Sequence, residues 1–212
     1  MTSFLKELNS LLFGKTLQER EINENFRYFT HNLNEQSRIL EIGCGRGEAI
    51  RELIKHLRKE KIRPEEIIVS DVDTRDLIMA EKNVRKEKNL VGKLSFRRED
   101  ATRLNFPDGH FDLVYGFSVL HHIDNWRSAI KEISRVLKNK GRYIMAEHTT
   151  EFFSLLPIVR YFDRATGFFS ESELKQEFLK SKLQPILWEY RGFYKKFFKG
   201  SLRVVAEKVG NF

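Results

Sequence analysis

The feature that most constrains the fold of this 212-residue chain is a hydrophobic strand pattern that runs directly into a glycine-rich turn. Residues 38–42 read Arg-Ile-Leu-Glu-Ile, and a helical pattern begins at Glu48 after Gly43, Gly45 and Gly47. Glycine permits a sharp turn and a close backbone approach to a ligand, and a helix N-terminus presents unpaired N–H groups. The pattern predicts a site for a nucleotide-like ligand at the carboxyl end of a first parallel strand.

The sequence after this turn alternates between helical and strand patterns. Helices are expected at residues 48–61, 76–88 and 126–137, and strands at 67–70, 94–97, 111–116 and 142–146. A turn at 138–141 is expected to separate the last helix from the last of these strands. Strands spaced by helices indicate βαβ units. We therefore expect an α/β fold with a doubly wound, mostly parallel, Rossmann-like sheet covered on both faces.

The two ends of the chain depart from this alternation. Residues 185–190 and 202–207 are strand patterns joined by a short loop, which predicts an antiparallel C-terminal hairpin strand within or beside the sheet. Residues 3–13 and 17–33 are helical patterns, expected to pack over the domain that follows. The predicted organisation is an N-terminal helical extension, residues 1–36, and one domain, residues 37–212.

The residues around the glycines discriminate between ligands. A dinucleotide fingerprint has the spacing G-x-G-x-x-G, and Glu48 stands here where its last glycine would be. Glu41 precedes Gly43 by two residues. A carboxylate there repels a pyrophosphate and attracts an ammonium group, so a cationic amino-acid-like ligand is favoured and NAD(P) is not expected.

This stretch resembles motif I of the class I S-adenosylmethionine (SAM)-dependent methyltransferases. The resemblance continues with Asp71 at the end of the second strand, with Ala80-Glu-Lys-Asn83, and with the Asp100-Ala101 and Phe106-Pro-Asp108 segment. It ends with a fourth strand and the run Leu120-His-His122. The likeness extends from about Ile39 to Glu147. It is closest to the small-molecule type 11 and ubiquinone/menaquinone methyltransferase group.

The resemblance implies that SAM is the cofactor and indicates which residues bind it. Glu41 would lie near the methionine end, and Asp71 would accept the ribose hydroxyls. Asp73 is the alternative acid, but only Asp71 lies nine residues before Ala80 and directly at the strand end. Asp100 would accept the adenine amino group. The expected cofactor-binding residues are Glu41, Gly43, Cys44, Gly45, Gly47, Asp71, Val72, Asp100, Ala101 and Phe117.

The residues that serve the methyl acceptor are harder to identify, because methyl transfer mainly requires alignment of donor and acceptor. His121 and His122 are weak candidates for a general base, since histidine can take a proton near neutral pH. Cys44 is interpreted as a loop residue and not as a nucleophile, and Asp112 as structural. One cysteine excludes an intrachain disulfide and a multi-cysteine zinc site, and no metal is expected.

Two further segments bear on the acceptor. The aromatic and apolar residues within 148–170 are either a lid over a hydrophobic acceptor or core packing. The loop 191–203 combines five basic residues with aromatic ones and contains no acid: its basic residues are Arg191, Lys195, Lys196, Lys199 and Arg203. Such a loop fits an anionic membrane surface, single-stranded RNA or a solvated hairpin tip.

Composition leaves three functions open. The chain has a net charge of +8 and 41% hydrophobic residues, typical of a globular protein with a basic surface. We expect a cytoplasmic location, with peripheral membrane contact as an option.

The first hypothesis is methylation of a small, hydrophobic or lipid-like acceptor, the second a nucleic-acid methyltransferase, and the third a SAM-binding interaction protein without catalysis. The segment after Phe117 lacks the Asn/Asp-Pro-Pro-aromatic loop of amino-methylating DNA enzymes. The sequence does not indicate an oligomeric state.

Overall fold

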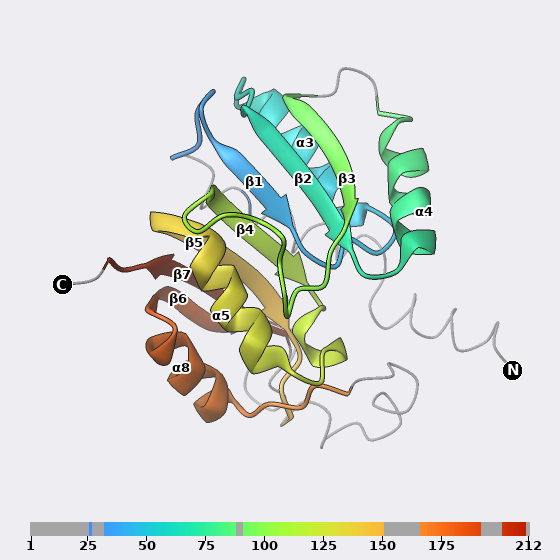
Figure 1. The fold of residues 1–212 in the computed structure, drawn as a ribbon. Helices are drawn as coiled ribbons and strands as arrows, with labels where there is room; N and C mark the ends of the chain where they lie inside the picture. Colours follow the sequence, from blue (N-terminus) through green and yellow to red (C-terminus); the bar gives the residue numbers. More distant parts are fainter. Residues whose placement is uncertain (1–25, 27–31, 88–90, 151–165, 192–200, 211–212) are drawn as a thin grey trace, which may run out of the picture.

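The computed structural model describes residue 26 and residues 32–87, 91–150, 166–191 and 201–210 (Figure 1). In this part of the chain, seven strands form one sheet in the order β3-β2-β1-β4-β5-β7-β6. Their bounds are β1 Arg38–Glu41, β2 Glu66–Asp71, β3 Lys93–Arg98, β4 Phe111–Phe117, β5 Leu137–Glu147, β6 Leu183–Arg191 and β7 Ser201–Lys208.

The directions of the strands confirm the predicted fold class. β1 to β5 pair in parallel, whereas β7 is antiparallel to both β5 and β6. The C-terminal hairpin therefore extends the sheet, and its second strand is inserted next to β5. Because β1 to β5 run in one direction, their carboxyl ends meet at the same edge of the sheet (Figure 1).

Helices α3, α4, α5 and α8 cover the two faces of the sheet (Figure 1). α3 (Glu48–Lys59) and α4 (Thr74–Val84) lie on one face, and α5 (Trp126–Val136) and α8 (Glu171–Lys180) lie on the other. Each face carries its own cluster of buried apolar side chains. Ile39 and Val205 belong to the cluster under α3 and α4, and Leu40 and Val204 to the cluster under α5 and α8. The central strands are thus buried on both faces, as parallel sheets require.

The strand order reverses between β1 and β4. From β1 the chain continues outward through α3, β2, α4 and β3, and it then returns to β4 on the other side of β1. In open α/β sheets, ligands bind in the crevice at the carboxyl ends of the strands where this reversal occurs. The glycine turn after β1 lies at this point.

One local prediction needs correction, and one helix was missed. The turn expected at 138–141 is an irregularity within β5, because Leu137 already pairs with Phe111 and the pairing then jumps to Arg142 opposite Leu113. Lys140 takes the left-handed backbone conformation that this extra length requires, with φ 64°. α8 was not predicted, although its capping box is readable in sequence: Ser170 and Glu173 each bond the other's backbone N–H.

The N-terminal extension lies almost wholly outside the described residues. Phe26 lies in the second of the two helical segments predicted there, residues 17–33. It is helical and fully buried. Its ring packs edge-on against Tyr115 and Phe117 of β4, with centroid distances of 5.1 Å and 5.8 Å. This contact agrees with an extension that packs over the domain, and the boundary at residues 36 and 37 stays a prediction.

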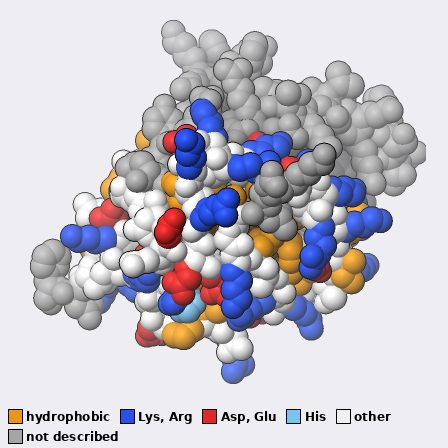
Figure 2. All heavy atoms as spheres, turned by 90° about the horizontal axis from the view of Figure 1, so that it is seen from above, with side chains coloured by type: hydrophobic (Ala, Val, Ile, Leu, Met, Phe, Trp, Pro, Cys, Tyr) orange, Lys and Arg blue, Asp and Glu red, His pale blue; other side chains and the backbone are white. Residues whose placement is uncertain are grey.

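The surface carries basic residues mixed with other types. Figure 2 shows Lys and Arg side chains distributed between acidic and apolar ones over the face turned toward the reader. Among the described residues, no helix combines the length and apolar character needed to cross a membrane.

Candidate functional site

The three glycines of the turn after β1 all have backbone angles that L-residues rarely adopt. Their φ values are +61° at Gly43, +50° at Gly45 and +84° at Gly47. A Cβ on Gly43 would lie 2.5 Å from a Val119 methyl group, and one on Gly47 would lie 3.1 Å from the Ala80 Cα. A Cβ on Gly45 would meet no atom within 4 Å. Gly43 and Gly47 therefore serve packing, whereas the backbone of Gly45 faces open space that a ligand can occupy.

Hydrogen bonds from neighbouring strands and helices hold the turn in place. The Cys44 N–H donates to the Ser70 carbonyl over 2.9 Å, and the Ser70 hydroxyl donates to the Glu41 carbonyl over 2.6 Å. On the other side, the Asn83 amide donates to the Arg46 carbonyl over 3.1 Å. Together with the close approach of Ala80 to Gly47, this bond explains why the Ala-x-x-Asn spacing of α4 accompanies the glycine turn.

Glu41 and Tyr115 form a buried pair beneath the turn. The Glu41 side chain is 2% exposed, and its Oε2 accepts a hydrogen bond from the Tyr115 hydroxyl over 3.1 Å. Burial raises the pKa of Glu41 well above its usual range, and the Tyr115 hydrogen bond opposes this only in part. The pKa of Tyr115 is also raised, first by burial and then by Glu41. Burial therefore disfavours the full negative charge assumed at Glu41 from the sequence.

Cys44 follows the first glycine and is buried. Burial raises the pKa of its thiol, and the neighbouring acids Glu41 and Asp71 raise it further. A thiol with a raised pKa is a poor nucleophile, since the thiolate is the reactive form. The interpretation of Cys44 as a loop residue agrees with these surroundings.

The two acids after β2 have different surroundings. The half-buried Asp71 accepts the Gly45 N–H on Oδ2 over 3.0 Å and the Asp73 N–H on Oδ1 over 2.9 Å. Asp73 instead caps α4 by accepting the Arg75 N–H over 2.8 Å, and it pairs with the Arg75 guanidinium over 2.6 Å. These bonds lower the pKa of Asp73 to about 2. Asp71 is thus the acid that contacts the glycine turn, while Asp73 serves the helix.

The end of β3 lies beside the end of β2. Arg98 donates to the Val72 carbonyl over 3.0 Å, and the Glu99 N–H donates to the Asp71 carbonyl over 3.1 Å. The Val72 residue is 59% exposed, although it is apolar. Asp100 accepts the N–H and the hydroxyl of Thr102, both over 2.8 Å. Asp71, the exposed apolar Val72 and Asp100 therefore lie at the ends of the adjacent strands β2 and β3.

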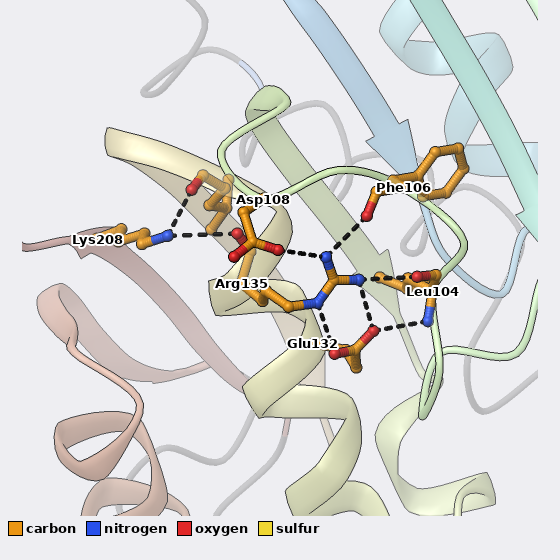
Figure 3. A network of polar contacts seen from close by, with 7 residues as sticks. Leu104, Phe106, Asp108, Glu132, Arg135 and Lys208 are labelled. Atoms are coloured by element: carbon orange, nitrogen blue, oxygen red, sulfur yellow. Dashed lines mark hydrogen bonds and ion pairs between the residues drawn. The ribbon is translucent and has the colours of Figure 1, made fainter.

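The segment after Asp100 and Ala101 is fixed by a polar network centred on Arg135 of α5 (Figure 3). The guanidinium donates to the carbonyls of Phe106 and Leu104 over 2.7 Å and 2.8 Å, and it pairs with Asp108 over 2.7 Å. Glu132 bonds both the guanidinium and the Leu104 N–H over 2.8 Å. The Phe-Pro-Asp part of the motif is therefore structural, because it fixes residues 104–108 on α5.

Asp112, at the start of β4, is structural as expected. It accepts the Arg38 N–H over 2.8 Å and pairs with Lys138 over 2.8 Å. It therefore joins β4 to β1 and β5 at the edge opposite the glycine turn.

The loop after β4 follows Phe117, whose ring lies 5.8 Å from that of Tyr115. Ser118 has the left-handed φ of 55°. The next N–H groups, of Val119 and Leu120, both donate to one Glu147 oxygen, Oε1, over 2.7 Å and 2.9 Å. The carboxylate at the end of β5 thereby holds the loop whose Val119 packs against Gly43.

Glu147 also contacts one of the two candidate histidines, His121. Its Oε2 lies 2.6 Å from His121 Nδ1, and the two side chains are 0% and 1% exposed. His122 is exposed, with its ring 4.2 Å from that of His121. Sequence reasoning missed Glu147, although it ends a strand with an acid in the same way as Glu41 and Asp71.

The two segments expected near the acceptor lie largely outside the described residues. Within 148–170, Phe169 is 1% exposed and packs on Trp126 at 5.1 Å, so this residue belongs to the core. Arg203 was counted with the basic residues of the loop 191–203, and this was wrong, although its place in the strand predicted at 202–207 is confirmed. Arg203 is buried in β7, where it pairs with Glu189, its cross-strand neighbour in β6. Lys195, Lys196 and Lys199 lie outside the described residues.

Comparisons with known proteins identify the family of this chain. A family model described as a methyltransferase domain matches residues 40–145. The chain is similar to a demethylmenaquinone methyltransferase of Bacteroides fragilis, with 30% identity over 112 residues that cover 53% of this chain and 43% of the relative. It is also similar to the ubiquinone/menaquinone biosynthesis C-methyltransferase UbiE of Pseudomonas paraeruginosa, with 29% identity over 120 residues, 57% of this chain and 45% of the relative.

Among solved structures, the fold is similar to that of geranyl diphosphate C-methyltransferase from Streptomyces coelicolor. The TM-score is 0.74 at 12% sequence identity, and the match covers 90% of this chain and 81% of the other. The match to each of the two curated relatives spans less than half of that relative's length.

Proposed function

The chain belongs to the methyltransferase-domain family of class I SAM-dependent methyltransferases, and from this premise we propose that it transfers the methyl group of SAM to a small, hydrophobic or lipid-like acceptor. The observation that carries the proposal is the bond between Gly45 and Asp71, on a turn whose Gly45 side is open. It brings the glycine turn and the strand-ending acid to one place at the strand-order reversal.

The residues around this point fit the parts of SAM. The open backbone at Gly45 allows close approach of the ligand, and Asp71 can accept ribose hydroxyls next to it. The exposed apolar Val72 suits the adenine ring, with Asp100 and Ala101 beyond it. Glu41 lies beneath the turn, where a ligand ammonium would favour its ionised form. Gly43, Cys44 and Gly47 shape the turn. Phe117, the last residue of β4, would border the cofactor site next to β1.

The acceptor class rests on the relatives. They are named for quinone methylation, and the solved neighbour is named for methylation of geranyl diphosphate. SAM supplies a methyl group that is activated by its attachment to a sulfonium. The protein's part is to align the acceptor with that methyl group and to exclude water. A hydrophobic acceptor is consistent with both requirements.

Calorimetry with SAM tests the cofactor site through a matched pair of variants. We expect Asp71→Asn to weaken binding about ten- to a hundredfold, since a charge-assisted pair of hydrogen bonds contributes roughly 1.5–3 kcal/mol. Asp73→Asn removes the same charge two residues away and keeps a good helix cap, so its affinity should stay within about threefold of wild type. Equal affinities in both variants and the wild type would contradict the assignment.

The acceptor is tested by product formation. The wild type is incubated with SAM and either reduced demethylmenaquinone or single-stranded RNA, and the methylated product is identified by mass spectrometry. We expect a methylated quinol, with turnover that falls in Asp71→Asn. Methylation of the RNA alone would replace the proposed acceptor class by a nucleic acid.

A further inference from the structure

The chain that leaves the end of β5 returns to the same place before α8 begins. The Thr150 N–H donates to the Phe169 carbonyl over 2.9 Å, and the buried Phe169 packs on Trp126. The next residue, Ser170, is the N-cap of α8. The core and a helix cap therefore fix the returning end of this segment. Figure 1 shows the residues before α8, in orange, crossing below the ends of β4 and β5.

Residues 166 and 167 fasten the returning chain to the loop after β4, and we call this pair the latch. The N–H groups of Thr166 and Gly167 both donate to the His121 carbonyl over 2.9 Å. The Thr166 hydroxyl donates to the His122 carbonyl over 3.2 Å. A Cβ on Gly167 would lie 2.1 Å from the Ile123 carbonyl oxygen, which is too close for any side chain. Only glycine therefore lets the two backbones approach so closely.

The other end of the same loop touches the cofactor turn. Val119 lies over Gly43, because a Cβ on this glycine would be 2.5 Å from a Val119 methyl group. Glu147 accepts the N–H groups of Val119 and Leu120 and so fixes this end of the loop to β5. The cofactor turn, the loop after β4 and the latch therefore form one contiguous set of contacts, and such sets can carry coupling between sites.

The strand order shows what the loop after β4 borders. Asp71, Val72 and Asp100, which are assigned to the cofactor, lie at the ends of β2 and β3, on one side of β1. β4 and β5 lie on the other side of β1. The loop after β4 therefore lines the part of the crevice that these three residues leave for the acceptor. The latch holds this acceptor-side wall.

We propose that Gly167 is a positioning residue that couples the two sides of the site: cofactor binding at the glycine turn strengthens the latch and thereby completes the acceptor-side wall. The inference rests on the cofactor site and the acceptor side of the proposed function, and it does not depend on which acceptor is methylated. By reciprocity, the closed latch increases the affinity for the cofactor by the same factor.

The contacts supply a physical reason for this coupling. A cofactor that approaches Gly45 restricts the backbone of the turn, and Gly43 passes the restriction to Val119 and so to the His121 carbonyl. Without cofactor, the latch depends on bonds to two neighbouring carbonyls, and Thr166 is exposed. Segments held in this way open more readily than the core, so a small stabilisation changes their population.

Amide hydrogen exchange, resolved by NMR, measures the latch in the wild type without any acceptor. Saturating S-adenosylhomocysteine should slow the exchange of the Thr166 and Gly167 N–H groups at least about fivefold, the lower end of typical couplings. The control amides are His110 and Val209, whose N–H groups are hydrogen-bonded at the opposite edge of the sheet. Their exchange should change less than about twofold.

A matched pair of variants tests the route of the coupling. Val119→Ala removes the methyl groups that lie over Gly43, so the slowing at the latch should fall below about twofold. Val91→Ala removes the same atoms from a buried position before β3 and should keep the full slowing. Gly167→Ala should weaken S-adenosylhomocysteine binding in calorimetry by the factor by which the ligand slows latch exchange in the wild type. With reduced demethylmenaquinone, its KM for the quinol should rise at least about fivefold while kcat stays within about twofold.

Three results would overturn the inference: no slowing at the latch, equal slowing at the control amides, or full slowing in Val119→Ala. The second would mean that the ligand stabilises the whole fold, and the third that it acts on the latch directly. If Gly167→Ala does not fold, Thr166→Val removes only the hydroxyl bond and should lose part of the slowing. A wild type that binds no S-adenosylhomocysteine would refute the cofactor site instead, and one that does not methylate the quinol would refute only the acceptor class.

Discussion

Alanine substitutions of the turn glycines should separate folding from cofactor binding. Gly45→Ala places a Cβ in open space, so it costs only the left-handed strain at φ +50°, about 1–2 kcal/mol. Gly47→Ala carries the same strain at φ +84° and also pushes against the Ala80 backbone at 3.1 Å, which adds about 1 kcal/mol of crowding. At about 2–4 °C per kcal/mol for a chain of this size, Tm should fall by about 2–8 °C and about 4–12 °C respectively.

Binding should follow the opposite order, because the Gly45 Cβ occupies the space proposed for the ligand. We expect SAM affinity at least about tenfold weaker in Gly45→Ala, measured by calorimetry well below Tm, with a smaller loss in Gly47→Ala. Gly109→Ala is the control. Gly109 also has a left-handed φ of +62° and nearly open space around it, but it lies in the turn before β4. It should lose as much stability as Gly45→Ala and bind SAM normally.

Two outcomes would refute this reasoning. Normal SAM affinity in Gly45→Ala would mean that the ligand does not approach this backbone. Weakened affinity in Gly109→Ala would mean that any strained glycine turn impairs binding through lost stability, and the loss at Gly45 would then carry no information about the site.

Three further predictions concern charge. Glu41→Gln should raise Tm at neutral pH: burial raises the pKa of Glu41, so its stabilising contribution is complete below about pH 4.5 and declines as pH rises through the folded-state pKa. The Tm difference from wild type, followed from pH 4 to 8, should therefore grow with pH, and a constant difference would contradict the cause. NADH should show no micromolar affinity in calorimetry, because Glu48 begins α3 where a dinucleotide fingerprint has glycine. Replacement of Lys195, Lys196 and Lys199 by Glu should abolish salt-sensitive sedimentation with anionic vesicles; a gel shift with single-stranded RNA lost instead would indicate a nucleic-acid surface.

Most of the fold could be predicted because its signals are local. The strand–glycine–helix pattern can be predicted from the sequence, because the three glycines have left-handed backbone angles that other residues avoid. The preference for Asp71 over Asp73 also agrees with a local fact, the capping of α4 by Asp73. The irregularity in β5 was taken for a turn because a residue such as Lys140 in left-handed conformation looks the same in sequence whether the chain reverses or continues.

The errors and omissions concern contacts between distant segments. Arg203 was counted with an exposed basic loop, but β7 is inserted between β5 and β6, so residues 202–206 are all buried and the arginine pairs with Glu189 across the strand. Glu147 was missed because its partners are 26–28 residues earlier in the chain. Neither the strand order nor that loop closure is encoded in the periodicity of one segment.

Three acids end parallel strands at the same edge of the sheet, and their surroundings determine what each can do. Glu41 is buried with one hydroxyl donor, and burial disfavours its ionised form. Glu147 is fully buried, and both of its oxygens are engaged by the loop after β4, so it acts through that loop. Asp71 is only half-buried and lies beside the open side of Gly45. Of the three, Asp71 can therefore contact a ligand directly, which is why its replacement is the sharpest test of the proposed cofactor site.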